Sequence, residues 1–223
     1  MLGIIGGTSL LFSDLPELTR QKIATPYGPA EVHTGEIALC LRHQFGLPPH
    51  RINHRASLAA LALAGVDTVV AFGSAGSLQP EIPPGSLLIP SDYVSLTDIP
   101  SIHDHAIEHV SPGISDDIAG IIARVVPGAR QGGVYVQTRG PRIETRAEVL
   151  ALAKIADVVG MTLASEATLA CELDMAFAAL CTVDNYAHGL GEEVLTYDHI
   201  LETSHRHRQR TGEILASIVE TLK

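Results

Sequence analysis

Residues 138–180 constrain the fold more than any other part of the chain, because they combine a polar turn, two helical patterns and a short apolar strand. The strand, residues 157–160, ends in Met161-Thr162, and a helix is expected to begin near Ser165. This order brings a turn, a strand end and a helix start close together, as in α/β folds. Small ligands bind at the carboxyl ends of strands in open α/β sheets, so we expect a ligand site here.

Apolar runs alternate with amphipathic helical patterns along the rest of the chain. The expected strands are residues 1–5, 23–26, 30–33, 37–42, 66–72, 86–90, 132–138, 157–160 and 176–182. The expected helices are residues 51–63, residues 114–125, an amphipathic helix with apolar residues at Val149, Leu150, Leu152 and Ile155, a helix from about residue 165, and residues 197–222. This alternation predicts a single α/β domain over residues 1–223, with a mostly parallel or mixed sheet.

The chain is rich in apolar residues and carries a net negative charge. Of its 223 residues, 46% are hydrophobic and 18% are charged, which is typical of a globular chain and not of a disordered one. The formal net charge of −10 argues against nonspecific binding to nucleic acid or to anionic membranes. An anionic substrate would therefore need a local cluster of cationic groups and backbone amides.

The three cysteines, Cys40, Cys171 and Cys181, are far apart, and each lies in an apolar run. They form no Cys-x-x-Cys pair, so we expect buried free thiols in a reducing cytoplasm. The first ten residues begin directly with a strand and lack the pattern of a signal peptide. No apolar segment reaches ~18 uninterrupted residues, so no membrane span is expected.

Three segments of small or polar residues at the ends of expected strands are suited to an oxyanion. Gly6-Gly7-Thr8 offers backbone N–H groups and a hydroxyl, although a tight turn without a ligand explains it equally well. Arg42 ends a strand and suits bidentate phosphate binding, whereas a surface charge pair is the simpler interpretation. Residues 73–77 follow the strand expected at residues 66–72, and their small side chains let a ligand approach the backbone, whereas a sharp turn between packed elements is the alternative.

Two polar segments leave their interpretation open. Asp184 and Asn185 follow the last expected strand, where a sheet presents its carboxyl ends, but a turn-forming pair is the alternative. A polar loop carries His103, His105 and His109, whose spacing could suggest a metal, but no acidic or cysteine residue completes a ligand set. We expect no metal and favour a mobile, ligand-facing loop.

Five short motifs occur in the order seen in the trimeric nucleoside phosphorylases. They are Gly3-Ile4-Ile5-Gly6-Gly7-Thr8, Arg42-His43, Ser74-Ala75-Gly76-Ser77, Gly140-Pro141-Arg142, and Gly160-Met161-Thr162 with Glu166. From end to end, the chain resembles the methylthioadenosine phosphorylases and 6-oxopurine nucleoside phosphorylases of that family. The resemblance implies a mixed central sheet that curls into a distorted barrel surrounded by helices, in a homotrimer or a hexamer of two trimers. It also implies a reaction without a cofactor, in which inorganic phosphate displaces a purine and yields free base and ribose 1-phosphate or its 5-methylthio analogue.

The resemblance also assigns residues to the phosphate and sugar ends of a substrate site. It implies phosphate contacts from Thr8, Arg42, His43, Ser74, Ala75 and Thr162, and substrate contacts from Ile143, Met161 and Leu195. A fixed cation, hydroxyls and backbone amides can hold phosphate without a metal. In the transition state, phosphate would stabilise a positively charged sugar while a donor at purine N7 stabilises the departing base.

The residues that would read the base are Glu144 and Asn185, with Asp184 as an alternative because the match to the family is ambiguous by one residue. Glu144 and Asn185 resemble the base-binding residues of 6-oxopurine enzymes, whereas adenine-specific members carry Thr-Asp-Tyr-Asp after the last strand. Hypoxanthine and guanine have an N1–H that ionised Glu144 can accept, but adenine N1 would face the carboxylate unpaired. Asn185 can donate to N7 or O6 and can also accept.

At the 5′ side of the sugar the chain differs from a plain inosine enzyme. Gly191 stands where those enzymes have a histidine that meets the 5′-hydroxyl, and Leu195 resembles the apolar residue that meets a 5′-methylthio group. The loop after His43 is short, and His50 is only a weak substitute for a second phosphate-binding residue there. We therefore expect 5′-methylthioinosine as the substrate, with inosine or guanosine next. A 5′-methylthioadenosine phosphorylase, a hydrolytic nucleosidase and a non-catalytic purine-binding module are the alternatives.

Overall fold

Strands β5 and β11 form the centre of the sheet in the computed structural model, which describes residues 1–10, 17–44, 46–191 and 197–223. The strands are β1 (Leu2–Gly6), β2 (Thr19–Thr25), β3 (Gly28–Thr34), β4 (Ala38–Leu41), β5 (Thr68–Ser77), β6 (Leu87–Ile89), β7 (Asp92–Ser95), β8 (Arg130–Gln131), β9 (Val134–Gln137), β10 (Val158–Gly160) and β11 (Ala176–Tyr186). β5 and β11 run parallel to each other, from the pair Thr68 and Ala176 to the pair Ser77 and Tyr186. This long pairing fixes the frame on which the shorter strands assemble.

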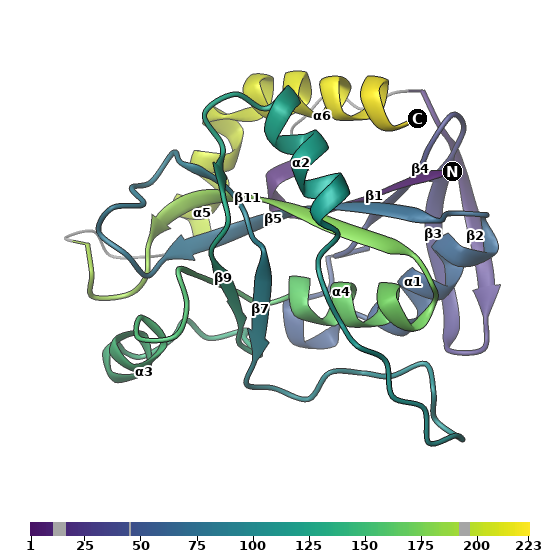
Figure 1. Ribbon diagram of the computed structural model, residues 1–223, viewed down its shortest axis with the longest axis horizontal. Coiled ribbons are helices and arrows are strands. Elements are labelled where there is room, and N and C mark those ends of the chain that lie inside the picture. The colour runs from purple at the N-terminus through teal and green to yellow at the C-terminus, as the bar shows by residue number, and fades with distance from the viewer. Residues whose placement is uncertain (11–16, 45, 192–196) are drawn as a thin grey trace.

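Helices lie on both sides of these central strands (Figure 1). They are α1 (His54–Leu63), α2 (Asp116–Val125), α3 (Arg146–Leu152), α4 (Leu163–Glu172), α5 (Tyr197–Arg206) and α6 (Arg208–Leu222), with two short 3-10 turns at Thr8–Leu10 and Pro49–Arg51. Side-chain oxygens of Asn53, Ser115 and Thr145 accept the backbone N–H three residues further on and so fix the starts of α1, α2 and α3. α2 packs with α6 on one side of β11, and α1 packs with α4 on the other.

The strand pairs close into a ring, which confirms the predicted mixed sheet and distorted barrel. β6 and β7 follow each other across Pro90-Ser91, and β8 and β9 follow each other across Gly132-Gly133, so each pair acts as one bent strand. The ring then runs from β5 through β10, β9 with β8, β7 with β6, and β11 back to β5. β1 joins β5 outside the ring and carries β4, β3 and β2 with it.

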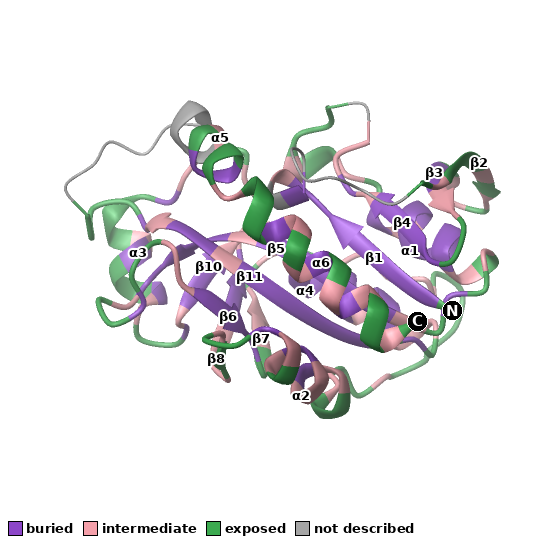
Figure 2. Ribbon diagram, turned by 90° about the horizontal axis from the view of Figure 1, so that it is seen from above, coloured by how far each residue is buried: buried purple, intermediate pink, exposed green. Residues whose placement is uncertain are grey.

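The core lies on both faces of β5, as the buried colour of the central strands shows (Figure 2). Alternate side chains of a strand point to opposite faces. Val69 and Ala71 belong to the cluster that packs against α1 and α4, whereas Val70 and Phe72 belong to the cluster that includes α2 and α6. All four are fully buried, which explains why this run reads as a continuous apolar strand.

Most of the predicted elements are confirmed to within a few residues, but the predicted end of a strand at Phe72 is wrong. β5 continues through these residues to Ser77, and β11 continues past Thr182 to Tyr186. The two strands satisfy each other's backbone N–H and C=O groups along this length. That pairing outweighs the low strand propensity of Gly73 and Gly76, from which the end of the strand is predicted.

Two helix predictions also need correction. The single helix predicted for residues 197–222 is broken at His207 into α5 and α6. The amphipathic helix predicted to include Ile155 ends at Leu152, and of its apolar residues Leu150 is 62% exposed and Ile155, beyond the helix, is 49% exposed. α3 has only seven residues, and its buried stripe is limited to Val149 and Leu152, which are three residues apart.

The cysteines are free, as predicted, and Cys40 and Cys181 are buried. Cys171 is only partly buried and lies in the last turn of α4. In the part of the chain that the structure describes, no helix combines the length and apolar character needed to cross a membrane.

Candidate functional site

A cavity of about 800 Å³ lies at the ends of β1, β4 and β10 and beside the last residues of β5 and β11. Its wall contains ten residues with a predicted role, which are Thr8, Arg42, His43, Ser74, Ala75, Ile143, Glu144, Met161, Thr162 and Asn185. Eleven further residues complete the described wall, namely Gln44, Gly46, Leu47, Pro48, Pro49, Gly76, Pro141, Arg142, Val159, Gly160 and Ala187. The chain therefore brings nearly all of its predicted site residues to one place.

One end of the cavity depends on the missing side chain of Gly7. A Cβ at this position would lie 2.5 Å from Arg42 Nη1 and 3.4 Å from His43 Nε2, so only glycine lets both nitrogens approach the turn so closely. The same turn carries Thr8, whose carbonyl accepts a 2.6 Å hydrogen bond from the Ser204 hydroxyl of α5. The Arg42 guanidinium, the His43 ring and Thr8 thus lie together at the turn formed by Gly7 and Thr8, an arrangement that suits an oxyanion.

Arg42 is held by a buried carboxylate. Its Nε and Nη2 donate to Glu166 Oε1 and Oε2 at 2.6 and 2.9 Å, and its Nη1 donates to the Phe72 carbonyl at 2.7 Å. Both side chains are at most 3% exposed. Burial lowers the pKa of the Arg42 guanidinium, but the charge and hydrogen bonds of Glu166 outweigh this and raise it. Nη1 and Nη2 each keep one N–H beyond these bonds, and Arg42 lines the cavity.

His43 offers the cavity a nitrogen whose protonation is set by its other side. Its Nδ1 lies 2.9 Å from the Leu47 carbonyl, which can only accept, so Nδ1 carries the hydrogen. In the neutral ring, Nε2 is therefore an acceptor on the side of Gly7. Burial lowers the pKa of His43, with the Leu47 bond acting in the opposite direction. This arrangement favours the neutral ring, which can accept a hydrogen from a protonated oxyanion.

Thr162 joins this end of the cavity from the start of α4. It is the N-cap of the helix, is 8% exposed, and its side chain makes no capping hydrogen bond. Its hydroxyl therefore remains available to a ligand at the positive end of the helix. Gly160, the last residue of β10, lets the Tyr135 side chain of β9 pack closely against the backbone, because a Cβ at residue 160 would lie 2.2 Å from the Tyr135 hydroxyl oxygen.

The cavity wall also presents a carboxylate and an amide. Glu144 is 7% exposed and accepts a hydrogen bond from the Thr138 hydroxyl, and its backbone carbonyl lies 2.9 Å from His188 Nδ1. Asn185 donates from Nδ2 to the Tyr186 carbonyl at 2.8 Å, an orientation assigned from this bond. Glu144 and Asn185 thus offer the cavity a carboxylate oxygen and an amide, which is a pattern that can read hydrogen-bonding edges of a base.

Asp184 takes a different position from Asn185. The strand register shifts between Val183 and Asn185, which leaves Asp184 as the extra residue of a bulge. Its carboxylate accepts a hydrogen bond from the Ser74 hydroxyl, and Asp184 is not among the described residues of the cavity wall. Burial raises the pKa of Asp184 to about 6. The structure therefore places Asn185 in the cavity and Asp184 behind Ser74.

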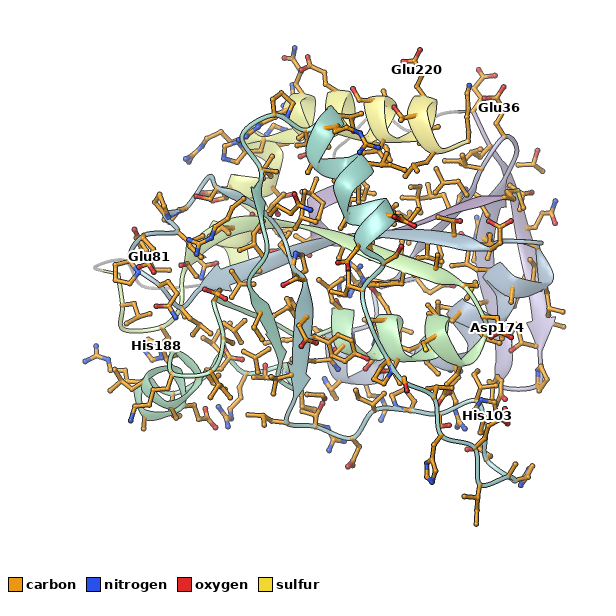
Figure 3. All side chains as sticks on the ribbon, in the orientation of Figure 1. Glu36, Glu81, His103, Asp174, His188 and Glu220 are labelled. Atoms are coloured by element: carbon orange, nitrogen blue, oxygen red, sulfur yellow. The ribbon has the colours of Figure 1, made fainter. Side chains whose placement is uncertain are left out.

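Several other predicted residues lie away from the cavity or outside the described chain. The predicted position of Leu195 lies outside the described residues. His50 is exposed and does not belong to the described wall. His103 lies at the lower edge of the molecule, far from His188 (Figure 3), and pairs with Glu108 at 3.0 Å. Within the described ranges, no three histidine, cysteine or acidic side chains gather as metal ligands would.

Glu166 and the segment 46–49 are the parts of the site to which sequence reasoning gave no role. Glu166 is part of a motif of the resemblance without a role of its own, and its pairing with Arg42 spans 124 residues. Pro48 and Pro49 gave a visible signal, because two prolines after a strand end break the chain and present an apolar surface.

The sheet is barrel-like, and its cavity is lined by groups that suit an oxyanion and by a carboxylate and an amide. These features define a class of enzymes that act on a substrate with an anionic and a heterocyclic part. The chain belongs to the phosphorylase superfamily, whose family model matches residues 1–220. It is 39% identical to a probable 6-oxopurine nucleoside phosphorylase of Archaeoglobus fulgidus, over 100% of this chain and 96% of that protein. It is 36% identical to a probable S-methyl-5′-thioinosine phosphorylase of Methanocaldococcus jannaschii, over 91% and 85%.

A solved structure supports the fold independently. The methylthioadenosine phosphorylase of Schistosoma mansoni in complex with adenine superposes with a TM-score of 0.86, over 99% of this chain and 91% of that one. The two sequences are only 22% identical, so this likeness concerns the fold alone. It agrees with the closed ring of strands and with the predicted fold class.

Proposed function

We propose that the protein catalyses phosphorolysis of a purine nucleoside, with a 6-oxopurine such as hypoxanthine as the leaving base. The observation that carries this proposal is the cavity itself, whose wall combines Arg42 and Thr162 with Glu144 and Asn185. Relatives that cover nearly the whole chain are named for 6-oxopurine nucleosides and for S-methyl-5′-thioinosine. Both names describe phosphorolysis of a nucleoside with an oxygen at C6 of its base.

The phosphate end would act by positioning and by hydrogen bonding. Arg42 is already paired with Glu166, so its free N–H groups, the Thr8 and Thr162 hydroxyls and Ser74 would supply directed donors more than net charge. Neutral His43 would accept the hydrogen of monohydrogen phosphate. Phosphate itself attacks C1′ of the sugar, which removes the need for a nucleophilic side chain.

The base end would stabilise the departing purine. Glu144 would accept from N1–H, and Asn185 would bridge O6 and N7 as negative charge develops on the ring. The buried position of Glu144 makes an unpaired contact with adenine N1 unfavourable, by ~1–3 kcal/mol. This donor and acceptor pattern favours the 6-oxopurine over adenine.

Met161 and Ile143 line the cavity and would contact the sugar. Together with Leu47 and Pro48 they give this part of the wall an apolar character that suits a thioether better than a hydroxyl. We therefore propose 5′-methylthioinosine as the preferred substrate, with inosine or guanosine next. The products would be hypoxanthine and 5-methylthioribose 1-phosphate, which fits a role in purine salvage.

We further propose that the enzyme works without a cofactor or a metal, as a homotrimer or a hexamer of two trimers in the cytoplasm. Phosphate attack on carbon needs no activation of a phosphoryl group, and the Arg42, Thr8 and Thr162 donors can hold the anion. Incubation with a chelator should leave turnover unchanged. Loss of activity with a chelator and recovery with zinc would contradict this part of the proposal.

The decisive experiment measures turnover of 5′-methylthioinosine, 5′-methylthioadenosine, inosine, guanosine and adenosine, each with and without phosphate. We expect phosphate-dependent release of hypoxanthine, fastest from 5′-methylthioinosine. Equal rates without phosphate would favour the hydrolytic nucleosidase, and faster turnover of 5′-methylthioadenosine would favour the adenine-specific alternative. Tight purine binding without turnover would indicate a binding module.

A further inference from the structure

Ser74 and Asp184 form a buried pair directly behind the cavity wall. Ser74 belongs to β5 and lines the cavity, and its hydroxyl donates to Asp184 Oδ2. Asp184 is 6% exposed and sits at the bulge of β11, where it has no partner residue on β5. Across the two strands Ser74 is paired with Thr182, which lies two residues before Asp184. The Asp184 carboxyl group therefore reaches back across to Ser74 on β5.

A serine hydroxyl has a single hydrogen, and Asp184 determines where it points. When Asp184 is ionised, both of its oxygens only accept, so the Ser74 hydrogen is directed into the carboxylate and the cavity meets a lone pair. When Asp184 is protonated, its own O–H can donate to Ser74 Oγ, and the Ser74 hydrogen is free to turn into the cavity. Only the second arrangement offers a donor to an anion.

We propose that Asp184 is a positioning residue that directs the Ser74 hydroxyl and thereby sets the affinity of the cavity for phosphate. This inference rests on the proposed phosphorolytic function, because phosphate is the anion concerned. It gives Asp184 a role at the phosphate end, through another side chain, in place of direct contact with the base.

The surroundings of Asp184 allow its carboxyl group to change protonation under ordinary conditions. Burial raises its pKa to about 6, while hydrogen bonds from Ser74 of β5 and Thr182 of β11 act in the opposite direction. The Cys181 thiol on the same strand has its pKa raised to about 12, chiefly by burial, so it stays neutral. The nearby Arg42 charge is already offset by Glu166. Protonation of Asp184 also removes a negative charge that would oppose an incoming anion.

The variant Asp184→Asn imitates the protonated carboxyl group. Its amide nitrogen can donate to Ser74 Oγ and its oxygen can accept from Thr182, which leaves the Ser74 hydrogen free at every pH. We expect inorganic phosphate, measured by calorimetry at pH 8, to bind about 2- to 12-fold more tightly to Asp184→Asn than to the wild type. At pH 5.5 the two affinities should converge. The ratio of the two proteins cancels the ionisation of phosphate itself.

Two further variants separate this role from a structural one. In proteins that also carry Ser74→Ala, the change Asp184→Asn should alter phosphate affinity much less, because the pair then has no hydroxyl to direct and only the change of charge remains. The Thr182 hydroxyl lies close enough to lower the pKa of the Asp184 carboxyl group, although it donates to the Gly73 carbonyl at 3.4 Å, so the pH at which affinity changes should be higher in Thr182→Val than in the wild type. The KM for phosphate should follow these affinities, while kcat at saturating phosphate changes little.

The outcomes are distinct. A ratio that is the same at pH 5.5 and pH 8 would overturn the inference. An effect of Asp184→Asn that is equally large in the Ser74→Ala background would also overturn it, since that effect would come from charge alone. In either case, phosphate-dependent turnover would still support the proposed function. If the wild type neither binds phosphate nor needs it for turnover, the proposed function and this inference fall together.

Discussion

The guanidinium of Arg42 and the carboxylate of Glu166 face each other in a buried bidentate pair, with Nε to Oε1 at 2.6 Å and Nη2 to Oε2 at 2.9 Å. The pair joins the end of β4 to the first turn of α4 and therefore connects the two sides of the phosphate end of the cavity. A bidentate pair fixes the plane of the guanidinium, which decides the direction of its two remaining N–H groups. Glu166 thus acts on the site without lining the cavity.

The variant Glu166→Gln should lower both stability and phosphate binding. It leaves the buried Arg42 charge without its partner, and breaking such a pair costs about 3–5 kcal/mol of unfolding free energy. Urea denaturation measures this loss, and the KM for phosphate measures the loosened guanidinium. The matched control is Glu148→Gln, which weakens the exposed bidentate pair between Glu148 and Arg142 and should have a much smaller effect. Equal losses in the two variants would show that burial does not set the strength of the Arg42 pair.

The variant Gly7→Ala should impair the phosphate site while leaving the base site intact. The added methyl group would lie 2.5 Å from Arg42 Nη1, so the guanidinium must move away from the turn. A displacement of about 1 Å can reduce catalysis by roughly 100-fold, and the loss should appear in kcat/KM for phosphate. Gly113→Ala is the control, because a Cβ there meets no atom within 4 Å. Wild-type kinetics in Gly7→Ala would mean that Arg42 does not need its close approach to the turn.

His54 should make the protein sensitive to acid. It is 8% exposed, and its Nδ1 has no hydrogen-bond partner among the described residues. Burial lowers its pKa from 6.5 to about 4, although Glu166 acts in the opposite direction. Between these two pH values the unfolded chain binds more protons than the folded one, so the free energy of unfolding should fall as the pH drops through this window. The fall should reach roughly 3 kcal/mol below pH 4.

The variant His54→Phe tests this assignment. It replaces the imidazole with an apolar ring of similar size, so the part of the acid sensitivity that lies between pH 6.5 and pH 4 should decrease. His50→Gln, at an exposed position, should leave the profile of the wild type. Unfolding free energies from urea titrations at several pH values give the comparison. The same acid sensitivity in His54→Phe and in the wild type would assign it to other groups.

The sequence indicates the parts of the site that depend on local chemistry. Thr8, Ser74 and Thr162 could be predicted because each follows or ends an apolar strand, and α/β sheets present such residues at one edge. The continuation of β5 through residues 73–77 could not, because the pairing with β11 provides its stability and local propensity does not include it. The same reason hides the partner of Arg42, which lies 124 residues away in a different element.

The register shift in β11 shows the limit of motif matching at the base site. Sequence reasoning left Asp184 and Asn185 as alternatives, because a one-residue shift exchanges them. The bulge between Val183 and Asn185 places them in different surroundings, with Asn185 in the cavity wall and Asp184 behind Ser74. A bulge is a feature of strand pairing, so a single sequence does not reveal it.

Glu144 and Asn185 should make the wild-type enzyme prefer 6-oxopurines over 6-aminopurines. Glu144→Gln keeps the size of the side chain but adds an amide donor that can meet adenine N1. Combining it with Asn185→Asp goes further, since a protonated Asp can donate to adenine N7 while its other oxygen accepts from the 6-amino group. Each buried mismatch costs ~1–3 kcal/mol, so the preference should shift by roughly 5- to 150-fold per contact.

The measurement is kcat/KM for 5′-methylthioinosine and 5′-methylthioadenosine in the wild type, in Glu144→Gln and in the double variant. Since Thr138 donates to Glu144, Thr138→Val serves as a control that disturbs the position of the carboxylate without changing its charge. It should lower the rate with both substrates more than it changes their ratio. A wild-type preference for the adenine substrate would contradict the specificity and leave phosphorolysis intact. The same ratio in all proteins would mean that neither Glu144 nor Asn185 reads the base.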